Sequence, residues 1–106
     1  MSETILHITT RSAWEAACAT GRYEPPSLEQ EGFIHLSDPH QVAAVAQARY
    51  AGVDGLVLLH VSTERLTAPL KYEAADGDSF PHLYGALNLD AVIEVTPLGA
   101  DRNTAG

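Results

Sequence analysis

The stretch GFIHLSD, residues 32–38, organises the predicted architecture, because it places a short strand directly before the start of a helix. Strict alternation along the strand puts Ile34 and Leu36 on one face and His35 on the other. A polar imidazole ring therefore stands in the middle of an otherwise buried-looking strand. We expect His35 to contact any ligand or substrate that this chain binds.

A helix is predicted to follow this strand at once. Asp38 is a suitable N-cap, and Pro39 suits the first helical position, where a missing N–H costs no hydrogen bond. Apolar residues between positions 42 and 46 form a stripe with helical spacing, and Gly52 is a natural end.

Upstream of this segment the pattern predicts a strand, a helix and a connection. Residues 4–9 are β-prone and alternate, which places His7 on the face opposite the core-facing leucine and isoleucine. Residues 12–15, SAWE, have the spacing of a capping box, so a helix is expected to begin there and to end at Gly21. The run 22–31 contains two consecutive prolines and is predicted as an extended connection.

The rest of the chain contains strand signals only. The predicted strands are LVLLHV (56–61), LKYEA (70–74), FPHLYG (80–85) and AVIEV (91–95), with a turn at residues 76–78. An order of β-α-β-α followed by strands alone favours the α+β class over a doubly wound sheet.

Length and composition describe one globular domain. A chain of 106 residues can build one hydrophobic core but not two ordinary domains. Its 45% hydrophobic and 19% charged residues are typical of a globular protein. We predict a single domain over residues 1–98 and a flexible C-terminal tail over residues 99–106.

Charge and targeting signals narrow the class of partner. The formal net charge of -8 repels a phosphate backbone, so no nucleic-acid partner is expected. No apolar run approaches the roughly 18 residues of a membrane span, and no basic region precedes an apolar one at the start. We therefore expect no membrane partner and a cytoplasmic location.

Metal and thiol chemistry find little support. The five histidines show no HxH or HExxH spacing, and a single cysteine forms neither an internal disulfide nor a multi-thiolate site. No metal site is predicted. Cys18 shares a predicted apolar helix face with Trp14 and Ala17, so we expect a buried core thiol and no nucleophile there.

Three histidines on predicted strands are the main candidates for a site. His7, His35 and His82, together with Tyr72 and Tyr84, suggest one shared cleft. Each histidine alone is also explained as a half-buried hydrogen-bonding residue without chemistry. His40 and His60 are assigned to such structural roles. Glu73 is either a base or ribose ligand or a solvated edge residue, and Ser37 either orients a ligand or caps the following helix.

Five segments carry a resemblance to a known family. They are ILHI at 5–8, WEAA at 14–17, EGFIHLS at 31–37, LKYE at 70–73 and FPHLYG at 80–85. In this order they resemble the DUF952 family of small bacterial proteins without an assigned function, over about residues 4–98. The resemblance implies an ADP-ribosyltransferase-like fold, with a split, mainly antiparallel sheet, two N-terminal helices and NAD in a central cleft.

The resemblance also implies roles for individual residues. His7 is similar to a first-strand histidine that holds the adenosine ribose, and His35 occupies the position of an aromatic residue that stacks on nicotinamide. Many transferases of the ADP-ribosyltransferase fold have a late-strand glutamate, whose counterpart would fall near residues 80–82, where this chain has no carboxylate. The usual catalytic acid is therefore missing.

These observations lead to one expectation and one alternative. We expect a cleft lined by the three strand histidines and both tyrosines, which binds NAD or a related small nucleotide and is a candidate for cleaving or transferring ADP-ribose. The alternative is a non-catalytic small-molecule or protein-interaction module that kept the fold. The residues assigned to ligand binding are His7, His35, Ser37 and Tyr72, and those assigned to the reacting group are His82, Tyr84 and Glu73.

Overall fold

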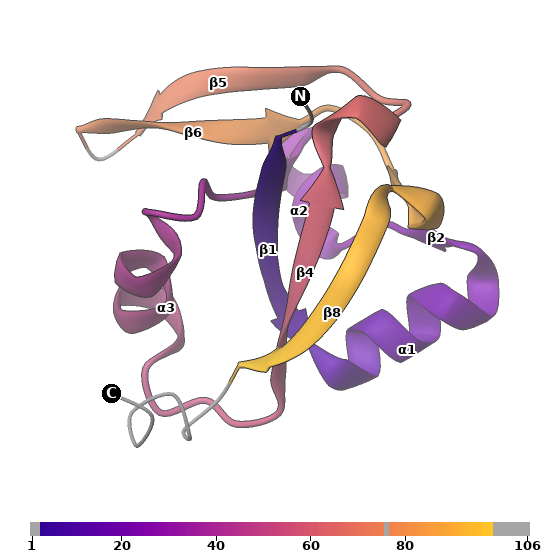
Figure 1. Ribbon diagram of the computed structural model, residues 1–106, viewed down its shortest axis with the longest axis horizontal. Coiled ribbons are helices and arrows are strands. Elements are labelled where there is room, and N and C mark those ends of the chain that lie inside the picture. The colour runs from indigo at the N-terminus through magenta and orange to yellow at the C-terminus, as the bar shows by residue number, and fades with distance from the viewer. Residues whose placement is uncertain (1–2, 76, 99–106) are drawn as a thin grey trace.

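The computed structural model describes residues 3–75 and 77–98, and its centre is a three-stranded antiparallel sheet. Strands β1 (Thr4–Thr10), β4 (Leu56–Ser62) and β8 (Val92–Leu98) lie in the order β1-β4-β8 (Figure 1). Every residue of β1 faces a partner in β4, which fixes the register of the sheet. The apolar run predicted at 56–61 thus forms the central strand.

A second antiparallel sheet diverges from the first. It contains β3 (Ile34–His35), β6 (Asp78–Leu83) and β5 (Leu70–Ala75) in the order β3-β6-β5, and β5 and β6 form the long hairpin in Figure 1. The two sheets are tied by a bridge in which Leu6 and Ser37 exchange backbone hydrogen bonds of 2.7 and 2.8 Å.

Three helices and a short strand pair complete the fold. Figure 1 shows α1 (Arg11–Thr20) and α3 (Val42–Tyr50) on opposite sides of β1, with α2 (Pro26–Glu31) between them. Strands β2 (Arg22–Tyr23) and β7 (Leu87–Asn88) pair with each other. Two 3-10 turns, at Thr63–Arg65 and Leu89–Ala91, precede β5 and β8. The predicted α+β class with mainly antiparallel sheets is confirmed.

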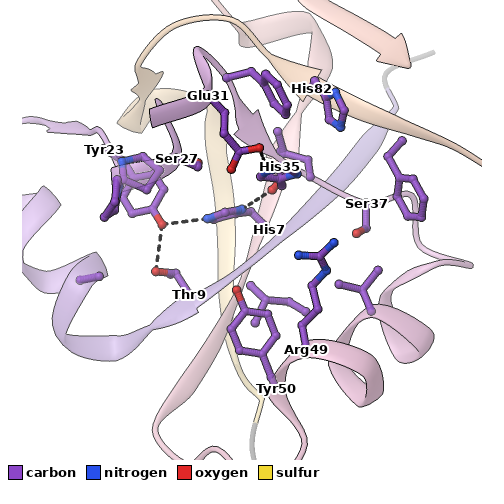
Figure 2. Close-up of a pocket in the computed structure, with 18 of the residues that line it drawn as sticks. His7, Thr9, Tyr23, Ser27, Glu31, His35, Ser37, Arg49, Tyr50 and His82 are labelled. Carbon is purple, nitrogen blue, oxygen red and sulfur yellow. Dashed lines mark hydrogen bonds and ion pairs between the residues drawn. The ribbon is translucent and has the colours of Figure 1, made fainter. Parts of the chain in front are cut away.

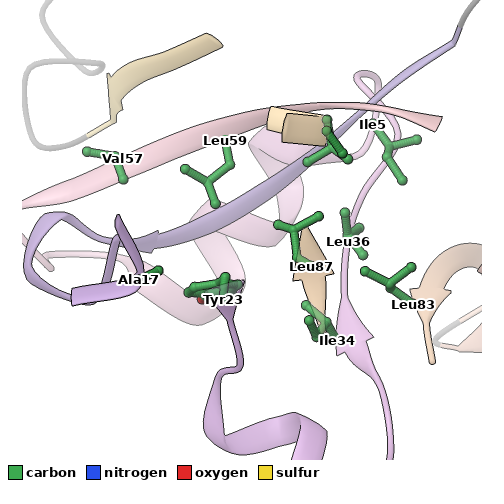
Figure 3. Close-up of a cluster of buried hydrophobic side chains, with 11 residues drawn as sticks. Ile5, Ala17, Tyr23, Ile34, Leu36, Val57, Leu59, Leu83 and Leu87 are labelled. Atoms are coloured by element: carbon green, nitrogen blue, oxygen red, sulfur yellow. The ribbon is translucent and has the colours of Figure 1, made fainter. Parts of the chain in front are cut away.

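The hydrophobic core occupies both faces of the central sheet. On one face Ile5 packs with Leu59, Ile34 and Leu36, as Figure 3 shows. On the other face β1 packs on α3 through a second cluster of Leu6, Ile8, Val42, Ala46 and Leu56. Burial on both faces explains why β1 lacks a solvent-facing side.

The first helix begins before the predicted capping box. Thr10 is the N-cap, and its Oγ1 accepts a hydrogen bond of 3.1 Å from the Ala13 N–H. Because Thr10 is the last residue of β1, the chain enters the helix without a separate loop, and Ser12 already lies inside the first turn. The helix therefore begins at Arg11, before the predicted start at residues 12–15.

The two other helices also differ from prediction. The connection at 22–31 contains α2, because Pro26 stands in its first turn, where proline lacks only a hydrogen bond that the helix does not make. The helix after Asp38 begins at Val42, because residues 38–41 form a turn in which the Gln41 N–H donates to the Asp38 carbonyl at 2.9 Å. The N-terminal half thus has three helices, where two were expected.

Cys18 is exposed, contrary to the prediction of a buried core thiol. The covered face of α1 consists of Ala13, Trp14 and Ala17, and Cys18 follows Ala17 by one residue, about 100° around the helix. The predicted tail at 99–106 lies outside the described residues, as does Asp76 in the predicted turn. None of the described helices has the length and apolar character to cross a membrane.

Candidate functional site

A cleft of about 1300 Å³ opens beside β1 and reaches from α1 to α3 and the β5–β6 hairpin. Figure 2 shows β1 along its floor, with His7 near the centre and Arg49 and Tyr50 entering from α3. Small-molecule sites commonly have volumes of roughly 300–1,000 Å³. The cleft is therefore larger than most such sites.

His7 is held on the floor of the cleft by both ring nitrogens. Nδ1 lies 2.6 Å from the carbonyl oxygen of His35, and Nε2 lies 2.8 Å from the hydroxyl of Tyr23, whose oxygen lies 2.9 Å from Thr9 Oγ1 (Figure 2). The His7 side chain belongs to the buried polar residues. These contacts join β1, β2 and β3 at one point.

The protonation of His7 follows from its surroundings. Burial lowers the pKa of His7 to about 4, so the ring is neutral at pH 7. A carbonyl oxygen only accepts, so Nδ1 carries the proton and Nε2 accepts the single proton of the Tyr23 hydroxyl. The remaining partner, Thr9, then donates its hydroxyl proton to the Tyr23 oxygen. His7 therefore brings no positive charge to a ligand between pH 8 and pH 6.

Three rings gather at the end of the cleft nearest the β5–β6 hairpin. Phe33 stacks on His82 with centroids 4.1 Å apart and planes 19° apart. His35 presents a ring edge to both, with centroid distances of 4.8 Å to Phe33 and 5.3 Å to His82. All three residues line the cleft. This ring cluster therefore offers a ligand one apolar phenyl ring and two imidazole rings.

The carboxylate of Glu73 contacts the ring cluster on the side away from the cleft. Glu73 Oε1 lies 2.8 Å from His82 Nδ1 and accepts a hydrogen bond of 2.5 Å from the Tyr84 hydroxyl. The hydrogen bonds from Tyr84 and then His82 lower the pKa of Glu73, and the bond to Glu73 raises the pKa of Tyr84. Glu73 is therefore a carboxylate at neutral pH, oriented toward the ring of His82.

Arg49 is the cation of the cleft that has no carboxylate partner among the described residues. Figure 2 shows its side chain pointing from α3 toward the space between His7 and Ser37. Arg22 also lines the cleft but lies 3.7 Å from Glu24 in an exposed ion pair. Arg49 is exposed and lies in the last turn of α3, so its guanidinium is available to bind an anionic group.

Four of the seven predicted site residues come together in the cleft: His7, His35, Ser37 and His82. Glu73 and Tyr84 do not line it and reach it only through their contacts with His82.

Tyr72 lies apart from the cleft, contrary to the expectation that it lines the wall. It precedes Glu73 in β5, and consecutive residues of a strand face opposite sides. Its hydroxyl donates to Asp38 Oδ1 at 2.7 Å, beside a smaller hollow of about 540 Å³. Burial and this bond raise the pKa of Tyr72.

The sequence reasoning missed Arg49, Tyr23 and Phe33. Arg49 had one available signal, because it is the single charged residue in the helix VAAVAQARY. Tyr23 had none, since its role depends on a contact with His7, sixteen residues away. Among the described residues no three histidine, cysteine, aspartate or glutamate side chains are grouped as a metal site would require.

Comparisons with known proteins identify relatives without an assigned activity. The family model described as "Protein of unknown function (DUF952)" matches residues 8–95. The crystal structure of protein CC0527 from Caulobacter crescentus is 40% identical with a TM-score of 0.83, and the match covers 92% of this chain and 90% of that chain. The solution NMR structure of CC0527 is 39% identical with a TM-score of 0.80, over 94% and 88%. No curated protein matches the chain.

Proposed function

The chain belongs to the DUF952 family, whose function is unknown, and from the geometry of the cleft we propose that it binds NAD or a related nucleotide there. One observation carries the proposal: Arg49 and the ring cluster of Phe33, His35 and His82 enter the same cleft from different elements. A dinucleotide has an anionic pyrophosphate between two flat ring systems. It therefore needs a cation with apolar, aromatic surface beside it.

The remaining walls suit the rest of such a ligand. Alanines of α1 and α3 line the cleft between the polar groups, which leaves flat apolar surface for a second ring. The volume of about 1300 Å³ exceeds that of most sites for compact molecules, roughly 300–1,000 Å³. Glu24, Glu31 and Asp78 also line the cleft, so the support for a nucleotide comes from the volume, the apolar surface and Arg49, and not from the net charge of the lining.

Individual residues receive the following roles in this proposal. Arg49 binds the pyrophosphate, because guanidinium groups form paired hydrogen bonds with phosphate oxygens. His7, which is neutral and has both ring nitrogens engaged, offers ribose a van der Waals contact and phosphate none. His35, beside the exposed edge of the ring cluster, contacts the nicotinamide end, and Ser37 orients the ligand nearby.

Cleavage or transfer of ADP-ribose is the reaction that we propose for this site. His82, with Glu73 and Tyr84 behind it, is the group available at the nicotinamide end. The arrangement of two diverging antiparallel sheets around the cleft supports an ADP-ribosyltransferase-like relationship. A second candidate, a binding module without catalysis, is favoured by one observation: residues 80–82 supply the cleft with no carboxylate.

Calorimetric titration of the full chain with NAD, ADP-ribose and nicotinamide tests the proposal. We expect heat from NAD and ADP-ribose and weaker binding of nicotinamide, which lacks the phosphates. Chromatography of the same mixtures for released nicotinamide separates the enzyme from the binding module. Absence of binding by all three compounds would contradict the nucleotide proposal.

A further inference from the structure

The three histidines of the cleft differ in the freedom of their ring nitrogens. Both nitrogens of His7 are engaged, by the His35 carbonyl and by Tyr23. His35 has Nε2 bonded to Glu31 at 3.1 Å, and its side chain is 43% exposed. His82 has Nδ1 bonded to Glu73 at 2.8 Å, and its side chain is only 8% exposed. Of the three, His82 combines a fixed, largely desolvated ring with one unengaged nitrogen.

The unengaged nitrogen of His82 retains some exposed surface. Among the described residues no buried side-chain nitrogen or oxygen lacks a hydrogen-bond partner. No hydrogen bond between described residues involves His82 Nε2. The atom is therefore not fully covered, and the hollow that His82 borders is the cleft.

The orientation of the ring is set from three sides. Glu73 accepts from Nδ1, Phe33 covers one face at a centroid distance of 4.1 Å, and Tyr84 holds the same carboxylate oxygen. Because a carboxylate only accepts, it favours, of the two neutral tautomers, the one with the proton on Nδ1 and the lone pair on Nε2. A general base needs this state, held in place before substrate arrives.

We propose that His82 Nε2 is the general base of this site, with Glu73 as its positioning residue. The inference rests on the proposed nucleotide function and specifies its chemistry: His82 deprotonates the water or hydroxyl group that attacks C1′ of the nicotinamide ribose. The carboxylate missing from residues 80–82 is thereby replaced by one that acts through an imidazole.

The step balances without a further reactant. The attacking oxygen forms a bond to C1′, and the bond between C1′ and the nicotinamide nitrogen breaks. Its electron pair stays on that nitrogen and neutralises the positive pyridinium. The proton of the attacking group moves to His82 Nε2, and the resulting imidazolium is stabilised by Glu73 until the proton passes to solvent. With water the products are ADP-ribose, nicotinamide and one proton.

The first test measures NAD affinity and nicotinamide release separately. We expect His82→Ala to weaken NAD binding modestly, because Phe33 and His35 of the ring cluster remain, and at saturating NAD to release nicotinamide more slowly by roughly 10²–10⁴, the range for loss of a general base. Added imidazole should restore part of the release, because the removed ring leaves a space open to the cleft. His82→Gln is the matched control, since its side chain fills that space and blocks rescue.

The second test measures the positioning role by the tautomer of His82 and by the separate effects on kcat and KM. We expect ¹⁵N shifts of His82 to report the Nδ1–H tautomer in wild type and in Glu73→Gln, whose amide oxygen still accepts. Glu73→Ala should lose that preference. Both variants should lower kcat with little change in KM, because neither carboxylate oxygen is assigned to substrate binding.

The outcomes are distinguishable. If the wild-type protein binds none of the nucleotides, both the proposed function and the proposed reaction are wrong. Wild type that binds NAD without releasing nicotinamide overturns the general base and leaves binding intact. Release unaffected in His82→Ala, or an Nε2–H tautomer in wild type, overturns the assignment of His82 alone.

Discussion

His7 Nδ1 lies 2.6 Å from the carbonyl oxygen of His35, and this hydrogen bond joins the first strand of the central sheet to the first strand of the second sheet. The other nitrogen of the same ring reaches Tyr23 in β2. One buried imidazole thus connects three strands that are distant in sequence. The floor of the cleft depends on it.

Replacement of His7 should destabilise the fold. His7→Phe leaves the His35 carbonyl without its side-chain donor and removes one of the two partners of the Tyr23 hydroxyl, which keeps Thr9; a buried group left unsatisfied costs about 1–3 kcal/mol. We expect the midpoint of urea unfolding to fall accordingly. Tyr23→Phe should cost less, and Tyr50→Phe, whose hydroxyl makes no hydrogen bond to a described residue, should change little. Equal midpoints for all three variants would contradict this role.

The same residue should make stability depend on pH. Since the pKa of His7 is about 4 when folded and 6.5 in a model peptide, the unfolded chain binds more protons between these values. Stability is therefore complete above about pH 6.5 and is lost as pH falls toward 4, by up to about 3 kcal/mol from this residue. Urea unfolding from pH 8 to pH 4 should show a smaller loss for His7→Phe, which does not titrate. Parallel curves would refute the assignment.

Arg49 should contribute to nucleotide affinity through its charge. We expect Arg49→Gln to weaken NAD binding roughly tenfold to a hundredfold, which corresponds to about 1.5–3 kcal/mol for a charge-assisted hydrogen bond. Arg65→Gln is the matched control, because it makes the same change in charge at an exposed position that does not line the cleft. Calorimetry at two salt concentrations measures both. A similar loss in the two variants would show a general effect of net charge.

Gln41 should hold the β5–β6 hairpin against the start of α3. Its amide donates to Asp78 Oδ2 at 2.9 Å and to the Ser79 carbonyl at 2.7 Å, while its oxygen accepts from the Asp38 N–H at 2.8 Å. Gln41→Leu should lower the free energy of unfolding by about 1–3 kcal/mol and speed amide exchange in β6. Gln47→Leu, an exposed position on α3, is the control. Unchanged exchange in β6 would contradict this contact.

Much of the fold follows from local patterns. Ile34 and Leu36, placed on one face by alternation, are 0% and 2% exposed, and the apolar run at 56–61 is the central strand. The strand signals at 70–74 and 80–85 correspond to the hairpin of β5 and β6. Alternation and propensity are properties of neighbouring residues, so they are readable before any partner is known.

The boundaries of the helices were less predictable. Ser12 and Thr10 are both capable N-caps, and the end of β1 selected Thr10. The strands β2 and β7 contain two residues each and exist only because they pair with each other across more than sixty residues. Such choices depend on long-range contacts, which exceed local preferences of a few tenths of a kcal/mol.

In the candidate site too, some features follow from the local sequence and others from tertiary packing. Residue type and strand position alone indicate His7, His35 and His82, because a polar ring within an apolar strand is conspicuous in the sequence. The engagement of each ring nitrogen, the separation of Tyr72 from the cleft and the entry of Arg49 from α3 were settled by packing. The local sequence determines the face of a strand on which a side chain lies. Its contact partner belongs to a segment distant in the sequence, and the two segments are brought together by burial of the whole core.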